Sequence, residues 1–177
     1  MVEGRNVNWA AGLPPLPTTV VERRNASKTF NAWAQAILDE WQSRKGMAAE
    51  KGEESPNAWF KRQAYGLLAH YIETGQDGVF RLNPRADARP SRLVEEALKN
   101  PFKLGLLAMF ADESPLSRKD RHVFGNQMLY AWAHDVPPEL INGFLAVSGH
   151  PTQIAEKLKC GHVEPGFEQR HKSERLP

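Results

Sequence analysis

Apolar residues recur at helical spacing along most of this chain, in short stretches that proline and glycine separate. The clearest stretch is residues 27–45, where apolar side chains fall three or four positions apart: Phe30, Trp33, Ala34, Ile37, Leu38 and Trp41. That spacing puts them on one stripe of an α-helix, which must pack against another element. We expect Ser27 to cap this helix and Gly46 to end it.

Six further stretches show the same pattern and start near a residue that favours a helix N-terminus. They begin at Ser55-Pro56, after Ser91, at Pro101, at Ser114-Pro115 or Ser117, after Asp135 and at Pro151. The stretch 101–112 is apolar nearly all round, so we expect it at the centre of the core. Asp135 is expected to cap the helix that follows it. In the stretch 76–84, Val79 and Phe80 are the only residues typical of a strand, and two residues are too few to form a sheet.

The predicted fold is all-α, an irregular single-domain bundle of six or seven short helices. We expect an extended proline-rich arm at residues 1–26, a helical domain at 27–161 and a polar flexible tail at 162–177. A chain of 177 residues is long enough for one domain with its own core.

Composition narrows the class of protein without naming it. No apolar run approaches the roughly 20 residues that span a bilayer. The first residues lack the pattern of a secretory signal. Cys160 is the single cysteine, which excludes an internal disulfide framework. We therefore expect a cytoplasmic protein. The formal net charge of +2 permits nucleic-acid binding without arguing for it.

Catalytic and metal-binding patterns are weak. Cys160 lies two residues before His162, but a structural zinc site needs about four ligands in paired spacings. His70 and Glu73 share a helix face, yet no second such pair is present to complete a carboxylate-bridged site. We expect no metal, no cofactor and no catalytic residue.

The segment at about 136–160 resembles a helix-turn-helix. Two predicted helices meet at Ser148-Gly149-His150, and a glycine permits the sharp turn of that motif. Leu145 stands where the motif has a small alanine, and Ala155 stands where a branched residue packs. A second register, residues 131–144, fits those sizes better but places Asp135 in the turn and Glu139 at the end that would face DNA.

The resemblance implies a set of DNA-binding candidates. Thr152 and Gln153 would lie at the exposed start of the recognition helix and contact base edges. Phosphates would be contacted by Lys157, Lys159 and the linker residues Arg85 and Arg89. The basic cluster 118–122 could add phosphate contacts if it lies on the same face. Short charge runs are otherwise solvated loop and helix ends.

The proline-rich arm supplies candidates for binding another protein. Its prolines favour an extended backbone of the kind that aromatic grooves bind. The candidate residues are Trp9, Pro14, Pro15 and Pro17. The alternative is that this arm lies on the surface of its own domain. Our first hypothesis is a non-enzymatic regulatory or adaptor protein that docks on a partner protein. The alternative is a DNA-binding regulator that uses residues 136–160.

Overall fold

The helix predicted at the centre of the core is there. In a computed structural model, which describes residues 15–19, 25–47, 52–82, 95, 97–110 and 116–167, helix α7 (Pro101–Met109) buries all but two of its residues. The Asn100 side chain accepts hydrogen bonds from the backbone N–H groups of Phe102 (3.0 Å) and Lys103 (3.2 Å). This cap, followed by proline at the first helical position, starts the helix at Pro101.

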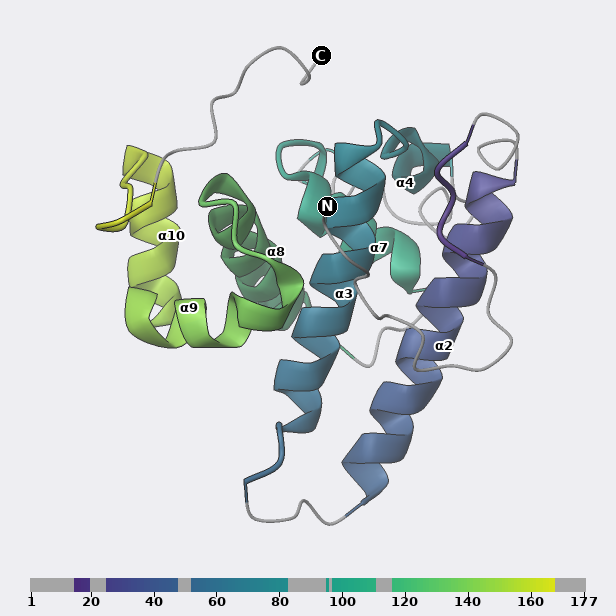
Figure 1. Ribbon diagram of the computed structural model, residues 1–177, viewed down its shortest axis with the longest axis horizontal. Helices are drawn as coiled ribbons and strands as arrows, with labels where there is room; N and C mark the ends of the chain where they lie inside the picture. The colour runs from purple at the N-terminus through teal and green to yellow at the C-terminus, as the bar shows by residue number, and fades with distance from the viewer. Residues whose placement is uncertain are drawn as a thin grey trace.

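The fold is all-α, as predicted. The remaining elements of the described residues are α2 (Ala26–Gly46), α3 (Pro56–Glu73), α4 (Gly78–Leu82), α8 (Arg118–Ala133), the 3-10 helix η1 (Pro138–Leu140), α9 (Ile141–Ser148) and α10 (Pro151–Cys160). Those residues contain no strand. Figure 1 shows α2 and α3 as a long antiparallel pair, with α9 and α10 at the opposite side of the molecule. No helix of the described residues is both long and apolar enough to cross a membrane.

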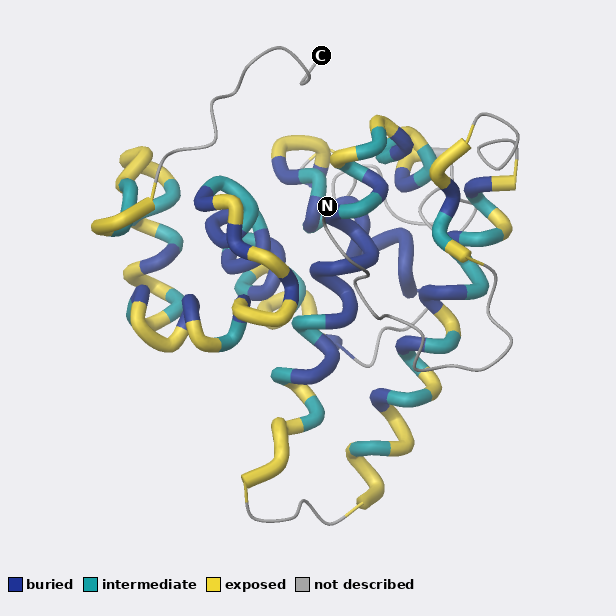
Figure 2. Tube along the Cα trace, in the orientation of Figure 1, coloured by how far each residue is buried: buried dark blue, intermediate teal, exposed yellow. Residues whose placement is uncertain are grey.

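Helix α3 is the second element of the core, and Figure 2 shows buried residues along most of its length. Two of its tyrosines tie distant segments to it. The Tyr71 hydroxyl donates to the backbone carbonyl of Ala26 at the start of α2 (3.0 Å). The Tyr65 hydroxyl donates to the carbonyl of Val136, between α8 and η1 (2.7 Å). Burial also raises the pKa of Tyr71, so its hydroxyl stays a donor.

Helix α7 lies close to both α3 and α8. A side chain added at Gly105 of α7 would meet Leu68 of α3, so glycine permits this approach. On the α8 side, the Asn100 amide donates to the carbonyl of Gly125 (3.1 Å). Helix α10 packs against α8 in turn. The α9–α10 end of the molecule is therefore attached to the core mainly through α8.

Several predicted boundaries agree with the structure, and one is shifted by a residue. Helices α3 and α8 follow Ser55 and Ser117, whose side chains accept from the backbone N–H groups of Ala58 and Asp120. Helix α2 starts one residue before Ser27, with Asn25 at the N-cap position. Val79 and Phe80, the two residues judged too few for a sheet, lie in α4. Without partner strands, their packing against the core decides their conformation.

Asp135 does not cap the helix that follows it. Its φ of 55° places it in the left-handed region, directly after the end of α8. The chain then turns at Pro137, which precedes η1 and supplies no side-chain cap. The stretch predicted as one helix is therefore a 3-10 turn followed by α9. Two consecutive prolines explain the change, because each fixes φ and removes a backbone donor.

The predicted arm and tail both contribute residues to the packed molecule. Pro17 is buried, and its carbonyl accepts hydrogen bonds from the side chains of Gln76 (2.8 Å) and His70 (3.2 Å). This part of the arm lies on its own domain. At the other end, residues 162–167 pack against α8 and α10, so the packed part continues past the predicted boundary at 161.

Candidate functional site

The turn between α9 and α10 is defined by three adjacent residues. Gly149 has a φ of 113°, a conformation that favours glycine, and it ends α9. His150 is the N-cap of α10 and Pro151 takes the first helical position. The Gln153 side-chain oxygen accepts from the His150 backbone N–H (2.9 Å), while the His150 ring accepts from the backbone N–H of Thr152 (3.4 Å). This capping box fixes where α10 begins.

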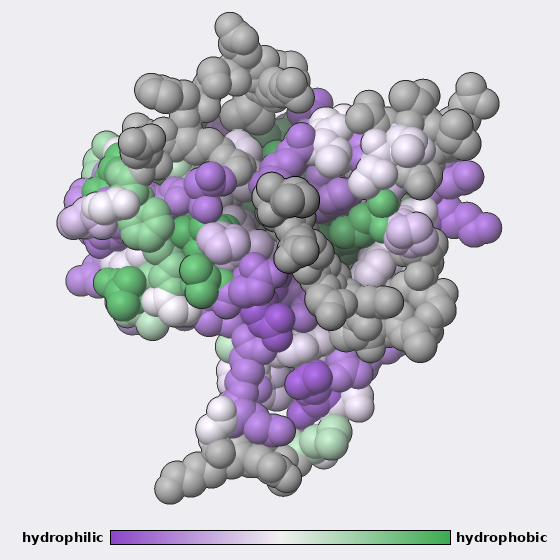
Figure 3. Space-filling model, viewed as in Figure 1, coloured by the Kyte–Doolittle hydropathy of each residue, from purple (hydrophilic) through white to green (hydrophobic). Residues whose placement is uncertain are grey.

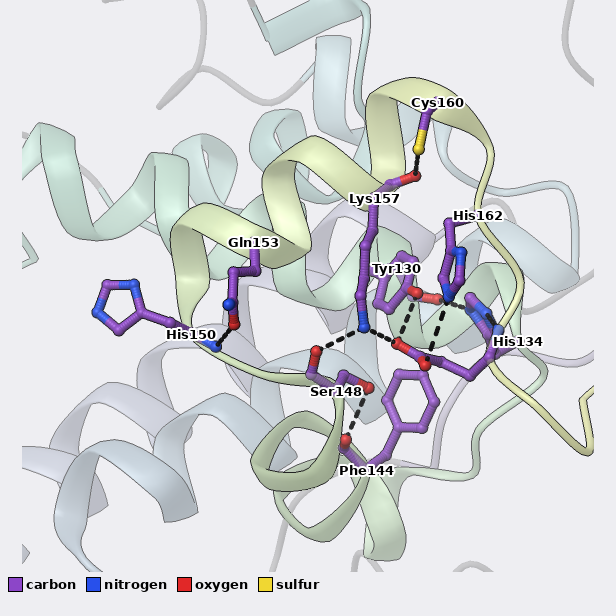
Figure 4. Close-up of polar contacts among 10 residues, drawn as sticks. Tyr130, His134, Phe144, Ser148, His150, Gln153, Lys157, Cys160 and His162 are labelled. Atoms are coloured by element: carbon purple, nitrogen blue, oxygen red, sulfur yellow. Dashed lines mark hydrogen bonds and ion pairs between the residues drawn. The ribbon is translucent and has the colours of Figure 1, made fainter.

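A polar cluster holds α10 in place from its other end, as Figure 4 shows. The Glu164 carboxylate accepts from the Lys157 ammonium (2.6 Å) and from the Tyr130 hydroxyl (2.8 Å). Lys157 also donates to the carbonyl of Ser148, the last residue of α9 (2.8 Å). We call Tyr130, His134, Lys157 and Glu164 the staple. It joins α8, α9, α10 and the segment that follows α10.

The hydrogen bonds of the staple define the tautomer of its histidine. The Nδ1 atom of His134 lies 2.7 Å from the Tyr130 carbonyl, which can only accept, so Nδ1 carries the hydrogen. The Nε2 atom accepts from the backbone N–H of Glu164 (3.0 Å). Both ring nitrogens therefore have a hydrogen-bond partner, and the ring is held between α8 and the segment after α10.

The electrostatics of the staple follow from its contacts. Burial raises the pKa of the Glu164 carboxyl, but the hydrogen bonds and charge of Lys157 and the bond from Tyr130 together hold it below its ordinary value. Burial and the neighbouring carboxylate raise the pKa of Tyr130. The cluster therefore contains the Lys157–Glu164 ion pair and a Tyr130 phenol that stays protonated at neutral pH. This arrangement positions helices and offers no activated nucleophile.

Apolar rings surround the staple. The Tyr130 ring lies 4.4 Å from that of His134 and 5.7 Å from that of Phe144, measured between centroids. Phe167 packs edge-on against Phe144 at 5.2 Å. The segment after α10 is thus held by side-chain packing as well as by Glu164. The α9–α10 pair and residues 162–167 form one supported unit, which we call the α9–α10 module.

The four DNA-binding candidates of α10 have different surroundings. Thr152, Gln153 and Lys159 are exposed. Gln153 is engaged in the capping box, and Lys157 is half-buried in the staple. The Thr152 hydroxyl lies 3.1 Å from Nδ1 of His150, so Thr152 too has a side-chain contact within the turn. Arg85 and Arg89 lie outside the described residues. DNA binding through this helix stays a prediction.

The partner-binding candidates of the arm also differ. Trp9 and Pro14 lie outside the described residues. Pro15 is exposed, whereas Pro17 is buried against α3 and the turn after it. A buried proline with an engaged carbonyl does not offer a ligand for a partner's groove. Binding through the arm would have to use the residues before Pro17.

The outward side of α9 is apolar and exposed. Val147 is 83% exposed and Leu140, at the end of η1, is 61% exposed. Gly143 and Ala146 lie between them and are exposed too. We call Leu140, Gly143, Ala146 and Val147 the α9 outer face. Figure 3 shows apolar side chains gathered on the surface over this end of the molecule.

Sequence reasoning missed the α9 outer face for an identifiable reason. Helix α9 reads INGFLAVS and carries no charge, so its periodicity does not separate a buried side from an exposed one. Ile141, Phe144 and Leu145 take the buried side. The signal that could have revealed the outer face is the surplus of apolar residues in a helix this short, because one side suffices for packing.

No group of three or more histidine, cysteine, aspartate or glutamate side chains in the described residues could hold a metal ion. Cys160 is exposed, and its thiol donates to the carbonyl of Lys157 (3.3 Å). Comparison with protein-family models, with curated proteins and with solved structures finds no significant match to the chain. A function for this protein is therefore inferred from the α9–α10 module and the surfaces around it.

Proposed function

We propose that the protein is a non-enzymatic docking protein whose α9 outer face binds an amphipathic helix of a partner protein. The observation that carries the proposal is the exposure of Val147 and Leu140 on one side of a firmly held helix. Single exposed apolar side chains are common on protein surfaces. Here two of them flank Gly143 and Ala146, which makes a continuous uncharged strip.

The shape of the α9 outer face favours a helix as the occupant. Gly143 and Val147 lie four residues apart on α9, the spacing of a helical ridge that packs into the groove of another helix, and Leu140 at the end of η1 extends the apolar side. The small residues between the two large ones let a second backbone approach closely. Covering the exposed parts of Val147 and Leu140 would contribute roughly 2–4 kcal/mol, about 30- to 1,000-fold in affinity.

The staple supports this proposal because it makes α9 a rigid platform. The carbonyl of Ser148 is held by Lys157, and the buried side of α9 packs on Tyr130 and His134 through Phe144. A binding face that is already ordered loses little conformational entropy when a partner docks.

Site-specific photo-crosslinking tests the proposal. A photoreactive residue at Val147 should give a discrete adduct with another protein in cells that express the chain. The same residue at Met47, which is 69% exposed at the end of α2, is the matched control and should not give that adduct. Val147→Asp should remove binding of the identified partner while leaving the urea midpoint within experimental error.

Three outcomes would contradict it. The first is the absence of any adduct from Val147. The second is the same adduct from Met47, because that would show contact without a defined face. The third is an adduct of twice the chain mass together with concentration-dependent sedimentation, which would make the occupant a second copy of this chain.

A further inference from the structure

A basic groove lies beside α10, on a different surface from the α9 outer face. It is a cavity of about 1210 Å³ between the start of α8, the start of α10 and the residues around the N-terminus of α7. Five cationic side chains line it: Lys99, Lys103, Arg118, Lys119 and Arg121. Asp120 is the single carboxylate among the described residues of that lining. We infer that this groove binds the phosphodiester backbone of a nucleic acid.

The position of the α8 cations is costly for the helix itself. Arg118, Lys119 and Arg121 lie in its first four residues, where the helix dipole disfavours positive charge. Asp120 is the one acidic residue there, and its carboxylate accepts from the Ser117 hydroxyl (2.7 Å) within the cap. Arg121 also donates to the Leu116 carbonyl (3.0 Å), so part of this charge has a structural role. Three cations at a helix end that disfavours them are nevertheless typical of a surface that binds an anion.

The same groove receives the start of a second helix. His150, Pro151 and Thr152 of the α10 N-terminus line it, so the positive end of that helix dipole adds to the field of the side chains. Lys99 and Lys119 are exposed, and neither forms an ion pair with another residue that the structure describes. Their charges are therefore available to an anion from outside.

Size and lining favour a polymer over a small anion. A volume of about 1210 Å³ exceeds the 300–1,000 Å³ of ordinary small-molecule sites. The cations come from two stretches of the chain, Lys99 with Lys103 and the first residues of α8. Among the described residues that line the groove there is no phenylalanine, tyrosine or tryptophan, and its only rings there are those of two histidines. This lining lacks the large aromatic anchors of a protein interface. Contacts to phosphates would bind all sequences alike.

Fluorescence anisotropy with labelled 20-base-pair duplexes of two unrelated sequences tests the inference. Both duplexes should bind equally, with an affinity that falls by roughly 100-fold between 50 and 200 mM salt, as expected for about four phosphate contacts. The variant Lys99→Gln/Lys119→Gln should weaken binding to both duplexes at least 10-fold. It should also reduce the slope of log K against log salt by about 2, near 0.9 per contact.

The control variant is Lys28→Gln/Lys159→Gln. It removes the same charge from two exposed lysines that do not line the groove. Its binding should change less than 3-fold, because distant surface charges are screened at these salt concentrations. Circular dichroism spectra and urea midpoints of both variants should match those of the unaltered protein.

Several results would overturn the inference. No duplex binding at 50 mM salt would do so. Equal losses of affinity in the two variants would show diffuse electrostatic attraction. A loss of affinity only in the control variant would place the DNA contact on the outer side of α10. Tripolyphosphate competing as well as the duplex at equal phosphate concentration would mean a small-anion site. Poly-glutamate binding as tightly as the duplex would mean an acidic protein ligand.

Discussion

Replacing Glu164 tests the structure around both proposed surfaces. Its Oε1 atom accepts from Lys157 at 2.6 Å and from Tyr130 at 2.8 Å, and its side chain is only 14% exposed. Hydrogen bonds to a charged group contribute about 1.5–3 kcal/mol each. The Lys157 side chain is 29% exposed and can regain water, so we expect Glu164→Ala to lower the free energy of unfolding by about 2–3 kcal/mol, less than the sum.

Urea denaturation followed by far-UV circular dichroism at neutral pH measures this loss. In a thermal scan the same loss should lower Tm by about 4–10 °C. Glu156→Ala is the control, because Glu156 is an exposed carboxylate on α10 and should change stability by less than about 0.5 kcal/mol. A double-mutant cycle with Lys157→Ala should give a coupling energy of about 1 kcal/mol or more.

The loss of stability in Glu164→Ala should be smaller at acid pH than at neutral pH. The pKa of Glu164 is lower in the folded protein than in the unfolded chain, where it is about 4.3. Its contribution is therefore complete above that pH and disappears as the pH falls through the folded pKa. The stability gap between the unaltered protein and Glu164→Ala should narrow at acid pH. A gap that persists undiminished when the carboxyl is protonated, or a loss no larger than that of Glu156→Ala, would refute the assigned role.

Three further changes test the helices and their packing by urea denaturation. Gly105→Ala should destabilise the protein by about 1–3 kcal/mol, because the added methyl meets Leu68, whereas Gly143→Ala should stabilise it by about 0.5–1 kcal/mol. Equal effects at the two glycines would contradict the close packing of α7 on α3. Asn100→Ala should cost about 2–3 kcal/mol, since it removes the α7 cap and the bond to Gly125. A loss below about 0.5 kcal/mol would contradict that role.

Local signals predicted most of the helices. Ser55, Asn100 and Ser117 cap helices through their own side chains, so a few neighbouring residues contain the information. The central place of α7 followed from its nearly complete apolar surface. The prediction that Asp135 caps a helix was wrong, because Pro137 and Pro138 impose a 3-10 turn. The preference of aspartate for N-cap positions does not include this effect.

The two proposed binding surfaces depend on tertiary contacts that the sequence does not reveal. Glu164 was assigned to a polar tail, because its partners Lys157, His134 and Tyr130 lie 7, 30 and 34 residues away. The cluster 118–122 became part of a groove only when α10 was placed beside α8. Helical periodicity places residues on faces of one helix, whereas a groove between helices depends on tertiary packing.

The staple also has a consequence for the order in which the protein matures. A chain is synthesised from its N-terminus, and its domains fold as they emerge. Tyr130 and His134 are synthesised well before Glu164. The polar groups of α8 therefore lack this partner until thirty or more further residues have been added to the chain. Until then Lys157 lacks the carboxylate of Glu164, and α10 is held by its caps and its packing on α8 without that ion pair. The end of the molecule that carries both proposed binding surfaces is therefore completed last, after the α2–α3–α7 core has been synthesised.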